Sequence, residues 1–123
     1  MARILVIDDN SDIHLILDEV LTEDGHTVDC ADDGKLGLAL AEKHRYDLII
    51  TDIIMPNMDG IEVITEIKKR SPEVQIIAMT GGSKKLDKNL ITCIANAMNV
   101  QKVIGKPLDL NELLATVHAL LAP

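Results

Sequence analysis

Polar side chains follow four strongly apolar runs of this sequence. Asp8 and Asp9 come after ILVI, Asp52 after LIIT, Thr80 after IIAM and Lys106 after VIG. Runs of this kind are typical of buried strands. An ionised carboxylate without a partner is costly to bury. We therefore expect Asp52 to lie just beyond the buried part of its strand and to meet a positive charge there.

Strand-like and helix-period segments alternate along the whole sequence. Strands are expected at residues 3–8, 27–31, 48–51, 75–79 and 102–104. Apolar residues at helical spacing predict helices from Ile13 to a stop at Gly25, from Gly34 to about His44, from Ile61 to just before Ser71, through Leu90, Ile91, Ile94 and Met98, and from Leu110 to Leu121. Asp109 and Glu112 make a capping-box pattern at the start of the last helix.

This alternation predicts the fold class α/β. Strands separated by helices favour parallel pairing through right-handed crossovers. Three of the strands are almost wholly apolar, which is typical of a sheet covered by helices on both faces. The apolar residues between Ile94 and Val103 fit either the core or a partner-binding surface, and both interpretations stay open.

The residues at the strand ends predict a single site. In a parallel sheet the carboxyl ends of the strands lie on one edge, where open α/β sheets bind their ligands. Asp8, Asp9, Asp52, Thr80 and Lys106 should therefore converge although they are far apart in the sequence.

This convergence would bring three carboxylates together with one lysine. Crowded carboxylates repel one another unless a cation intervenes, and hard oxygen ligands suit Mg²⁺ or Mn²⁺. With such an ion in place, Asp52 can act as a nucleophile toward phosphorus and form an aspartyl-phosphate. The ion, Lys106 and the Thr80 hydroxyl would stabilise the charge on the phosphoryl oxygens.

The chain resembles the receiver domain of two-component response regulators, the family of the chemotaxis protein CheY. The resemblance covers the whole chain and rests on four motifs in order: ILVIDDN, DLIITDIIMPNMDG, IIAMTGG and VIGKP. It implies a flavodoxin-like (βα)5 fold, doubly wound, whose five-stranded parallel sheet has the strand order 2-1-3-4-5.

The resemblance also implies a role for each site residue. Asp52 would be the phosphoacceptor, and Mg²⁺ would be held by Asp8, Asp9, Asp52 and the backbone carbonyl of Ile54. Lys106 would contact the phosphoryl group and precede a cis bond to Pro107, and Thr80 would be the switch hydroxyl.

Two features depart from the family pattern. Val103 stands three residues before Lys106, where the family usually has Tyr or Phe. A smaller apolar repacking or a helix shift is therefore expected in place of a rotating ring. Ile54 and Gly82 occupy positions that tune dephosphorylation in the family, and neither side chain can position a water.

Composition limits the other possibilities. The 123 residues suit one domain, 1–123, interpreted as a receiver without an output domain. The net charge of −8 argues against direct binding to nucleic acid or to an anionic membrane. The opening residues are not a secretory signal, and Cys30 and Cys93 are too few for a disulfide framework, so reduced thiols in the cytoplasm are expected.

The function expected from these observations is that of a stand-alone receiver and not of an enzyme, apart from its own phosphotransfer and slow autodephosphorylation. A sensor histidine kinase or a histidine phosphotransfer protein would donate the phosphoryl group. The signal would pass through altered protein–protein binding, at a surface made by the fourth helix, the fifth strand and the fifth helix.

Three alternative functions are compatible with parts of the sequence. A receiver-fold scaffold that is not phosphorylated is the serious one. A magnesium-dependent phosphatase of the haloacid dehalogenase type needs a second acid two positions after the nucleophile, where this chain has Ile54. A flavodoxin-like cofactor binder needs a phosphate-cradling loop and stacking rings, but the first loop is acidic and Tyr46 is the only aromatic residue.

Other polar residues have simpler interpretations. Asp12 fits a solvent-facing position in the first helical turn. The histidines lack metal-ligand spacing and are expected at the surface or its boundary: His14, His26, His44 and His118.

The residues Ile54 and Gly82 predict slow hydrolysis of the aspartyl-phosphate, because no side chain there can hold the attacking water. The lifetime of the phosphorylated chain, followed by intact mass after removal of the phosphodonor, measures this. Turnover within seconds would contradict it.

Overall fold

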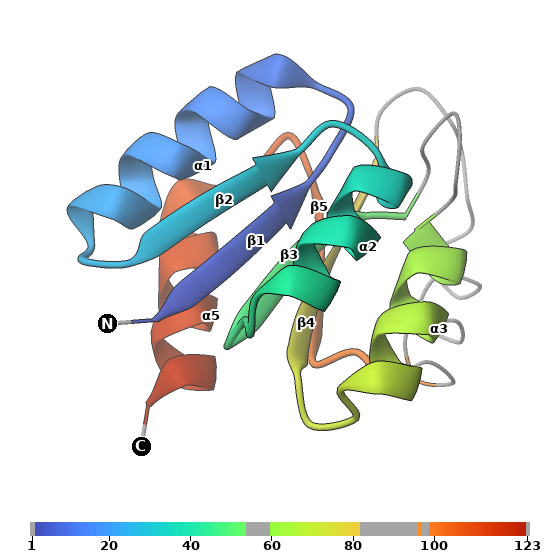
Figure 1. The fold of residues 1–123 in the computed structure, drawn as a ribbon. Coiled ribbons are helices and arrows are strands. Elements are labelled where there is room, and N and C mark those ends of the chain that lie inside the picture. The colour runs from blue at the N-terminus through green and yellow to red at the C-terminus, as the bar shows by residue number, and fades with distance from the viewer. Residues whose placement is uncertain (1, 54–59, 82–95, 97–98, 123) are drawn as a thin grey trace.

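A parallel sheet with helices on both faces forms the centre of the molecule (Figure 1). The computed structural model describes residues 2–53, 60–81, 96 and 99–122. Its five strands are ordered β2-β1-β3-β4-β5, and every neighbouring pair is parallel. They are β1 (Arg3–Ile7), β2 (Thr27–Ala31), β3 (Leu48–Asp52), β4 (Gln75–Gly81) and β5 (Lys102–Lys106). The predicted fold class and strand order are confirmed.

The helices of the described residues lie in two layers. Helices α1 (Ser11–Glu23) and α5 (Leu110–Leu121) cover one face of the sheet, and α2 (Gly34–Lys43) and α3 (Gly60–Arg70) cover the other (Figure 1). The helix predicted through Leu90, Ile91, Ile94 and Met98 lies outside the described residues.

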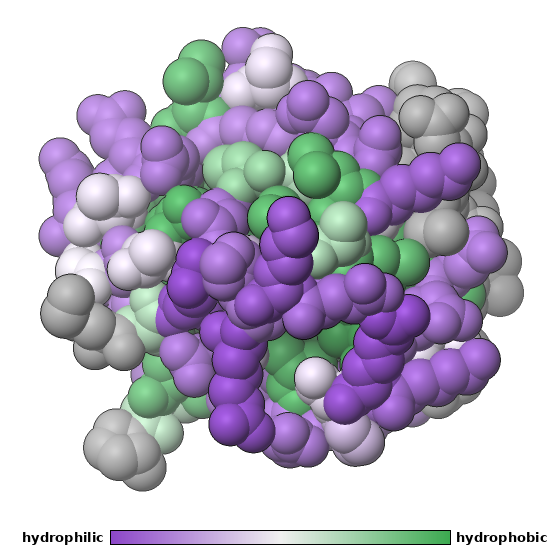
Figure 2. Space-filling model, in the orientation of Figure 1, coloured by the Kyte–Doolittle hydropathy of each residue, from purple (hydrophilic) through white to green (hydrophobic). Residues whose placement is uncertain are grey.

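Side chains that alternate between the two faces of the sheet explain why β1, β3 and β4 are mostly apolar. Ile4 and Val6 of β1 pack into the cluster beneath α1 and α5, whereas Leu5 and Ile7 pack into the cluster beneath α2 and α3. Because β1, β3 and β4 are buried on both sides, most of their successive residues need apolar side chains. Hydrophilic side chains cover most of the molecular face in Figure 2, and hydrophobic atoms show between them.

Local signals fix the ends of the helices. Asn10, Asp33 and Asp109 cap α1, α2 and α5 by accepting hydrogen bonds from amides of the first turn. The Asp109 half of the predicted capping box is therefore confirmed. Gly25 follows α1 with a φ of 95°, and the amides of Gly25 and His26 return to carbonyls of the last turn, as in a Schellman motif.

Three strands extend further at their carboxyl ends than the apolar runs predicted. Asp52 belongs to β3, Gly81 ends β4 and Lys106 ends β5. Register places these ends together, since Asp52 is opposite Met79 and Gly81 is opposite Lys106. Asp52 and Lys106 are therefore the last residues of their strands, and Thr80 is the last but one of β4.

Candidate functional site

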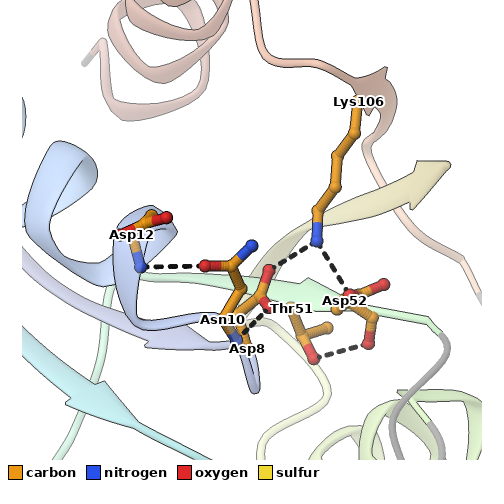
Figure 3. A network of polar contacts seen from close by, with 6 residues as sticks. All are labelled: Asp8, Asn10, Asp12, Thr51, Asp52 and Lys106. Atoms are coloured by element: carbon orange, nitrogen blue, oxygen red, sulfur yellow. Dashed lines mark hydrogen bonds and ion pairs between the residues drawn. The ribbon is translucent and has the colours of Figure 1, made fainter. Parts of the chain in front are cut away.

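Lys106 joins two aspartates at the carboxyl edge of the sheet (Figure 3). Its Nζ donates hydrogen bonds to Asp8 Oδ2 at 2.8 Å and to Asp52 Oδ2 at 2.9 Å. Asp8 follows β1, Asp52 ends β3 and Lys106 ends β5, so three separate strands position the group. The predicted convergence of these residues is confirmed.

Asp52 is more buried than the sequence led us to expect. Its exposed fraction is only 8%, and it lies within β3 instead of beyond it. The expectation that it emerges from the buried region is therefore wrong, whereas the expected positive partner is present. The Lys106 ammonium makes this burial tolerable, because a carboxylate paired and hydrogen-bonded to a cation avoids most of the cost of desolvation.

Asp9 completes a cluster of three acids. One carboxylate oxygen from each of Asp8, Asp9 and Asp52 lies within 4.8 Å of the others. Asp8 is fully buried, whereas Asp9 is exposed. Three carboxylates and one ammonium leave two negative charges uncompensated within this set, and oxygen donors of this kind fit a hard divalent cation.

The two oxygens of Asp8 have different partners. Oδ2 accepts from Lys106, and Oδ1 accepts from the backbone amide of Asn10 at 2.9 Å. Both oxygens of the buried carboxylate are therefore held by protein donors, which fixes its orientation.

Opposing influences act on Lys106. Burial lowers the pKa of its ammonium, but the hydrogen bonds and charges of Asp8 and Asp52 raise it by more, so the net pKa is above the ordinary lysine value. Lys106 is therefore a permanent cation at physiological pH, and it does not act as a base.

The other predicted site residues have different outcomes. Thr80 is buried, with an exposed fraction of 9%. It lies in β4 opposite Gly105 of β5, the residue before Lys106, so it is at the same edge of the sheet as the acidic cluster. Ile54 lies outside the described residues. The Lys106–Pro107 bond is cis, as the resemblance implied.

Sequence reasoning missed two residues that support Asp52. The buried hydroxyl of Thr51 donates to the Asp52 backbone carbonyl at 3.1 Å (Figure 3). Gly60, the first residue of α3, packs so closely that a Cβ there would lie 2.1 Å from the same carbonyl oxygen. Gly60 could have been found from its position at the start of a helix, but nothing in the sequence pattern shows the direction of the Thr51 hydroxyl.

An apolar groove adjoins the site. Ile13 and Ile16 of α1 form one side, and Pro107, Leu108 and Leu110 form the other, around a volume of about 560 Å³. Lys106 lies at its edge, so the groove opens beside the acidic cluster.

Comparison with known proteins decides the family. A model of the response regulator receiver domain matches residues 4–118. The chain belongs to this family. Receiver domains are signalling modules and not enzymes in the ordinary sense. Asp8, Asp52 and Lys106, which meet at the site, come from three of the four motifs that suggested the resemblance.

Individual relatives agree with this assignment. The receiver is 34% identical over 122 residues to the response regulator ArlR of Staphylococcus epidermidis, covering 98% of this chain and 53% of that protein. The receiver therefore spans about half the length of the curated relatives it matches.

Solved structures share the fold. The chemotaxis response regulator CheY4 of Vibrio cholerae is 28% identical with a TM-score of 0.87, covering 98% of this chain and 99% of that one. The response regulator TrrA of Thermotoga maritima, solved in complex with Mg²⁺–BeF, is 34% identical with a TM-score of 0.84, covering 98% of this chain and 100% of that one.

Within the described residues of the receiver, no helix is both long and apolar enough to span a bilayer.

The raised pKa of Lys106 predicts a loss of stability in alkali. A cation whose pKa is higher in the folded state stabilises the fold below its unfolded pKa of 10.5, and the contribution disappears as pH rises through the folded value. The variant Lys106→Met has no such group to titrate. Urea unfolding should therefore give a difference in unfolding free energy, wild type minus variant, that is constant near neutral pH and falls above about pH 10.5. A difference that stays level or rises there would contradict the pairing.

Proposed function

We propose that this receiver accepts a phosphoryl group on Asp52 from a phosphohistidine of a sensor histidine kinase or a histidine phosphotransfer protein. The observation that carries the proposal is the position of Lys106, whose Nζ is 2.8 Å from Asp8 and 2.9 Å from Asp52 at the edge of the acidic cluster. In the reaction an Asp52 oxygen forms a bond to phosphorus, the P–N bond to the donor imidazole breaks, and the phosphoryl group moves without any change of oxidation state.

The acidic cluster suits a divalent ion, and the proposal assigns Mg²⁺ or Mn²⁺ to it. Asp8, Asp9 and Asp52 would hold the ion, together with the backbone carbonyl of Ile54. Carboxylate oxygens of the three aspartates lie within 4.8 Å of one another. When bound, the ion neutralises the carboxylates and draws charge from the phosphoryl oxygens.

Lys106 and Thr80 have separate parts in the proposal. Lys106 already donates to Asp52 Oδ2, so its ammonium is within reach of oxygens on a phosphoryl group attached there. Thr80 lies in β4, next to the strand of Lys106. Its hydroxyl would turn toward the phosphoryl group and so change conformation on phosphorylation.

Phosphorylation would act by changing protein–protein binding. The added charge of about −2 favours one arrangement of a two-state element, and a partner reads the shift. We assign the partner surface to β5, α5 and the predicted fourth helix, which lies outside the described residues. We place the protein in the cytoplasm with its phosphodonor. Val103, half-buried beside Ile53 and Ala78, would repack on activation in place of an aromatic ring.

Phosphorylation by acetyl phosphate in the presence of Mg²⁺ tests the proposal. The wild type should gain one phosphoryl group by intact mass, and Asp52→Asn should gain none because it lacks the nucleophilic oxygen. Omitting Mg²⁺ or adding a chelator should abolish the gain.

Asp47→Asn is the matched control, since Asp47 is an exposed aspartate at the other end of β3. It should be phosphorylated like the wild type. A wild type that stays unmodified would favour the nonphosphorylated scaffold instead. An Asp52→Asn variant that is modified equally would mean that another residue accepts the phosphoryl group.

A further inference from the structure

The start of α1 is tied to the site through Asn10. The backbone amide of Asn10 donates to Asp8 Oδ1 at 2.9 Å, and its side-chain oxygen accepts from the amide of Asp12 at 2.8 Å (Figure 3). Its backbone carbonyl accepts from the amide of His14, which starts the helical hydrogen bonds of α1. Asn10 therefore contacts the site with one group and the helix with two others.

The capping bond fixes the direction in which the Asn10 amide points. Asn10 has the extended backbone of an N-cap, with φ −95° and ψ 115°, and its side chain stabilises this conformation by holding the first turn. In this conformation the amide faces Asp8, a carboxylate that is fully buried. Losing the cap would let the backbone of residue 10 relax and would leave Asp8 Oδ1 without a fixed donor.

The other described caps differ from Asn10 in two ways. Asp33 accepts from Leu36 in α2, and Asp109 accepts from Asn111 and Glu112 in α5. In the described structure only the cap of α1 uses its own amide to hold an acid of the site. It is also the neutral one of the three, which avoids a further carboxylate beside Asp8 and Asp9.

We propose that Asn10 is a positioning residue for the phosphorylation site: its side chain, through the capped backbone, orients Asp8 toward Lys106 and toward a bound divalent ion. The inference rests on the proposed function at Asp52. Asn10 itself contacts no reacting atom, so its effect must come through Asp8. Groups that orient metal ligands in this way typically change metal affinity by about 10- to 100-fold when they are removed.

The test compares variants that lose a cap at the site and away from it. Asn10→Ala removes the cap of α1, Asn10→Ser keeps a capping oxygen, and Asp33→Ala removes the cap of α2. Asp33→Asn removes the same charge as Asp33→Ala but retains the cap. Mg²⁺ affinity is measured by calorimetric titration, phosphorylation by the rate with acetyl phosphate, and stability by the midpoint of urea unfolding.

The expected pattern separates positioning from stability. Asn10→Ala and Asp33→Ala should both lower the urea midpoint because each loses a helix cap. Only Asn10→Ala should weaken Mg²⁺ binding, by about tenfold, and slow phosphorylation. Asn10→Ser should recover most of the Mg²⁺ affinity and most of the phosphorylation rate. Hydrogen exchange of the residue 10 amide in metal-free protein should be faster in Asn10→Ala than in Asn10→Ser.

Two outcomes would overturn the inference. If Asn10→Ala and Asp33→Ala bind Mg²⁺ as the wild type does, Asn10 is only a helix cap. If both lose affinity in proportion to their loss of stability, the effect is a general one. A wild type that binds Mg²⁺ but never gains a phosphoryl group would remove the proposed function, whereas the Mg²⁺ titration would still decide the role of Asn10.

Discussion

The contact on which the site depends is the ammonium of Lys106 placed between two aspartates from different strands. It allows Asp8 to be fully buried and Asp52 to be 8% exposed, both as hydrogen-bonded carboxylates. Without that cation the low-dielectric edge of the sheet would make both charges expensive. One ammonium does not balance three acids, and the remaining negative charge suits the site to a divalent cation.

The fold serves this contact by bringing strand ends together. Parallel pairing aligns the carboxyl ends of β1, β3 and β5 on one edge, although Lys106 is 98 residues from Asp8 in the sequence. Apolar clusters on both faces hold the strands rigidly, and Gly60 lets α3 begin directly against the Asp52 backbone. Because the interior is close-packed, a small displacement of a strand end would also move the helices packed against that strand.

The sequence predicted most of this arrangement, for a definite reason. Continuous apolar runs identify strands buried on both faces, and a polar residue at the end of each run marks the shared edge. The burial of Asp52 was mispredicted because it depends on where the Lys106 ammonium reaches, which is a property of the folded chain. The roles of Asn10 and Thr51 could not be predicted either, since residue type indicates a helix cap or a hydroxyl but not which carboxylate or carbonyl lies opposite it.

The most direct test is a titration of the metal-free protein with Mg²⁺, followed by backbone amide shifts in NMR. It measures whether the uncompensated negative charge of the acidic cluster binds a divalent ion. We expect saturable shifts confined to the segments around Asp8, Asp52 and Lys106. Mg²⁺ binding should be strongly weakened in Asp9→Asn and unchanged in Asp47→Asn. Mn²⁺ should compete for the same site, whereas Na⁺ at equal ionic strength should not. Equal Mg²⁺ binding by the wild type and Asp9→Asn, or no shifts at the edge of the sheet, would contradict the account.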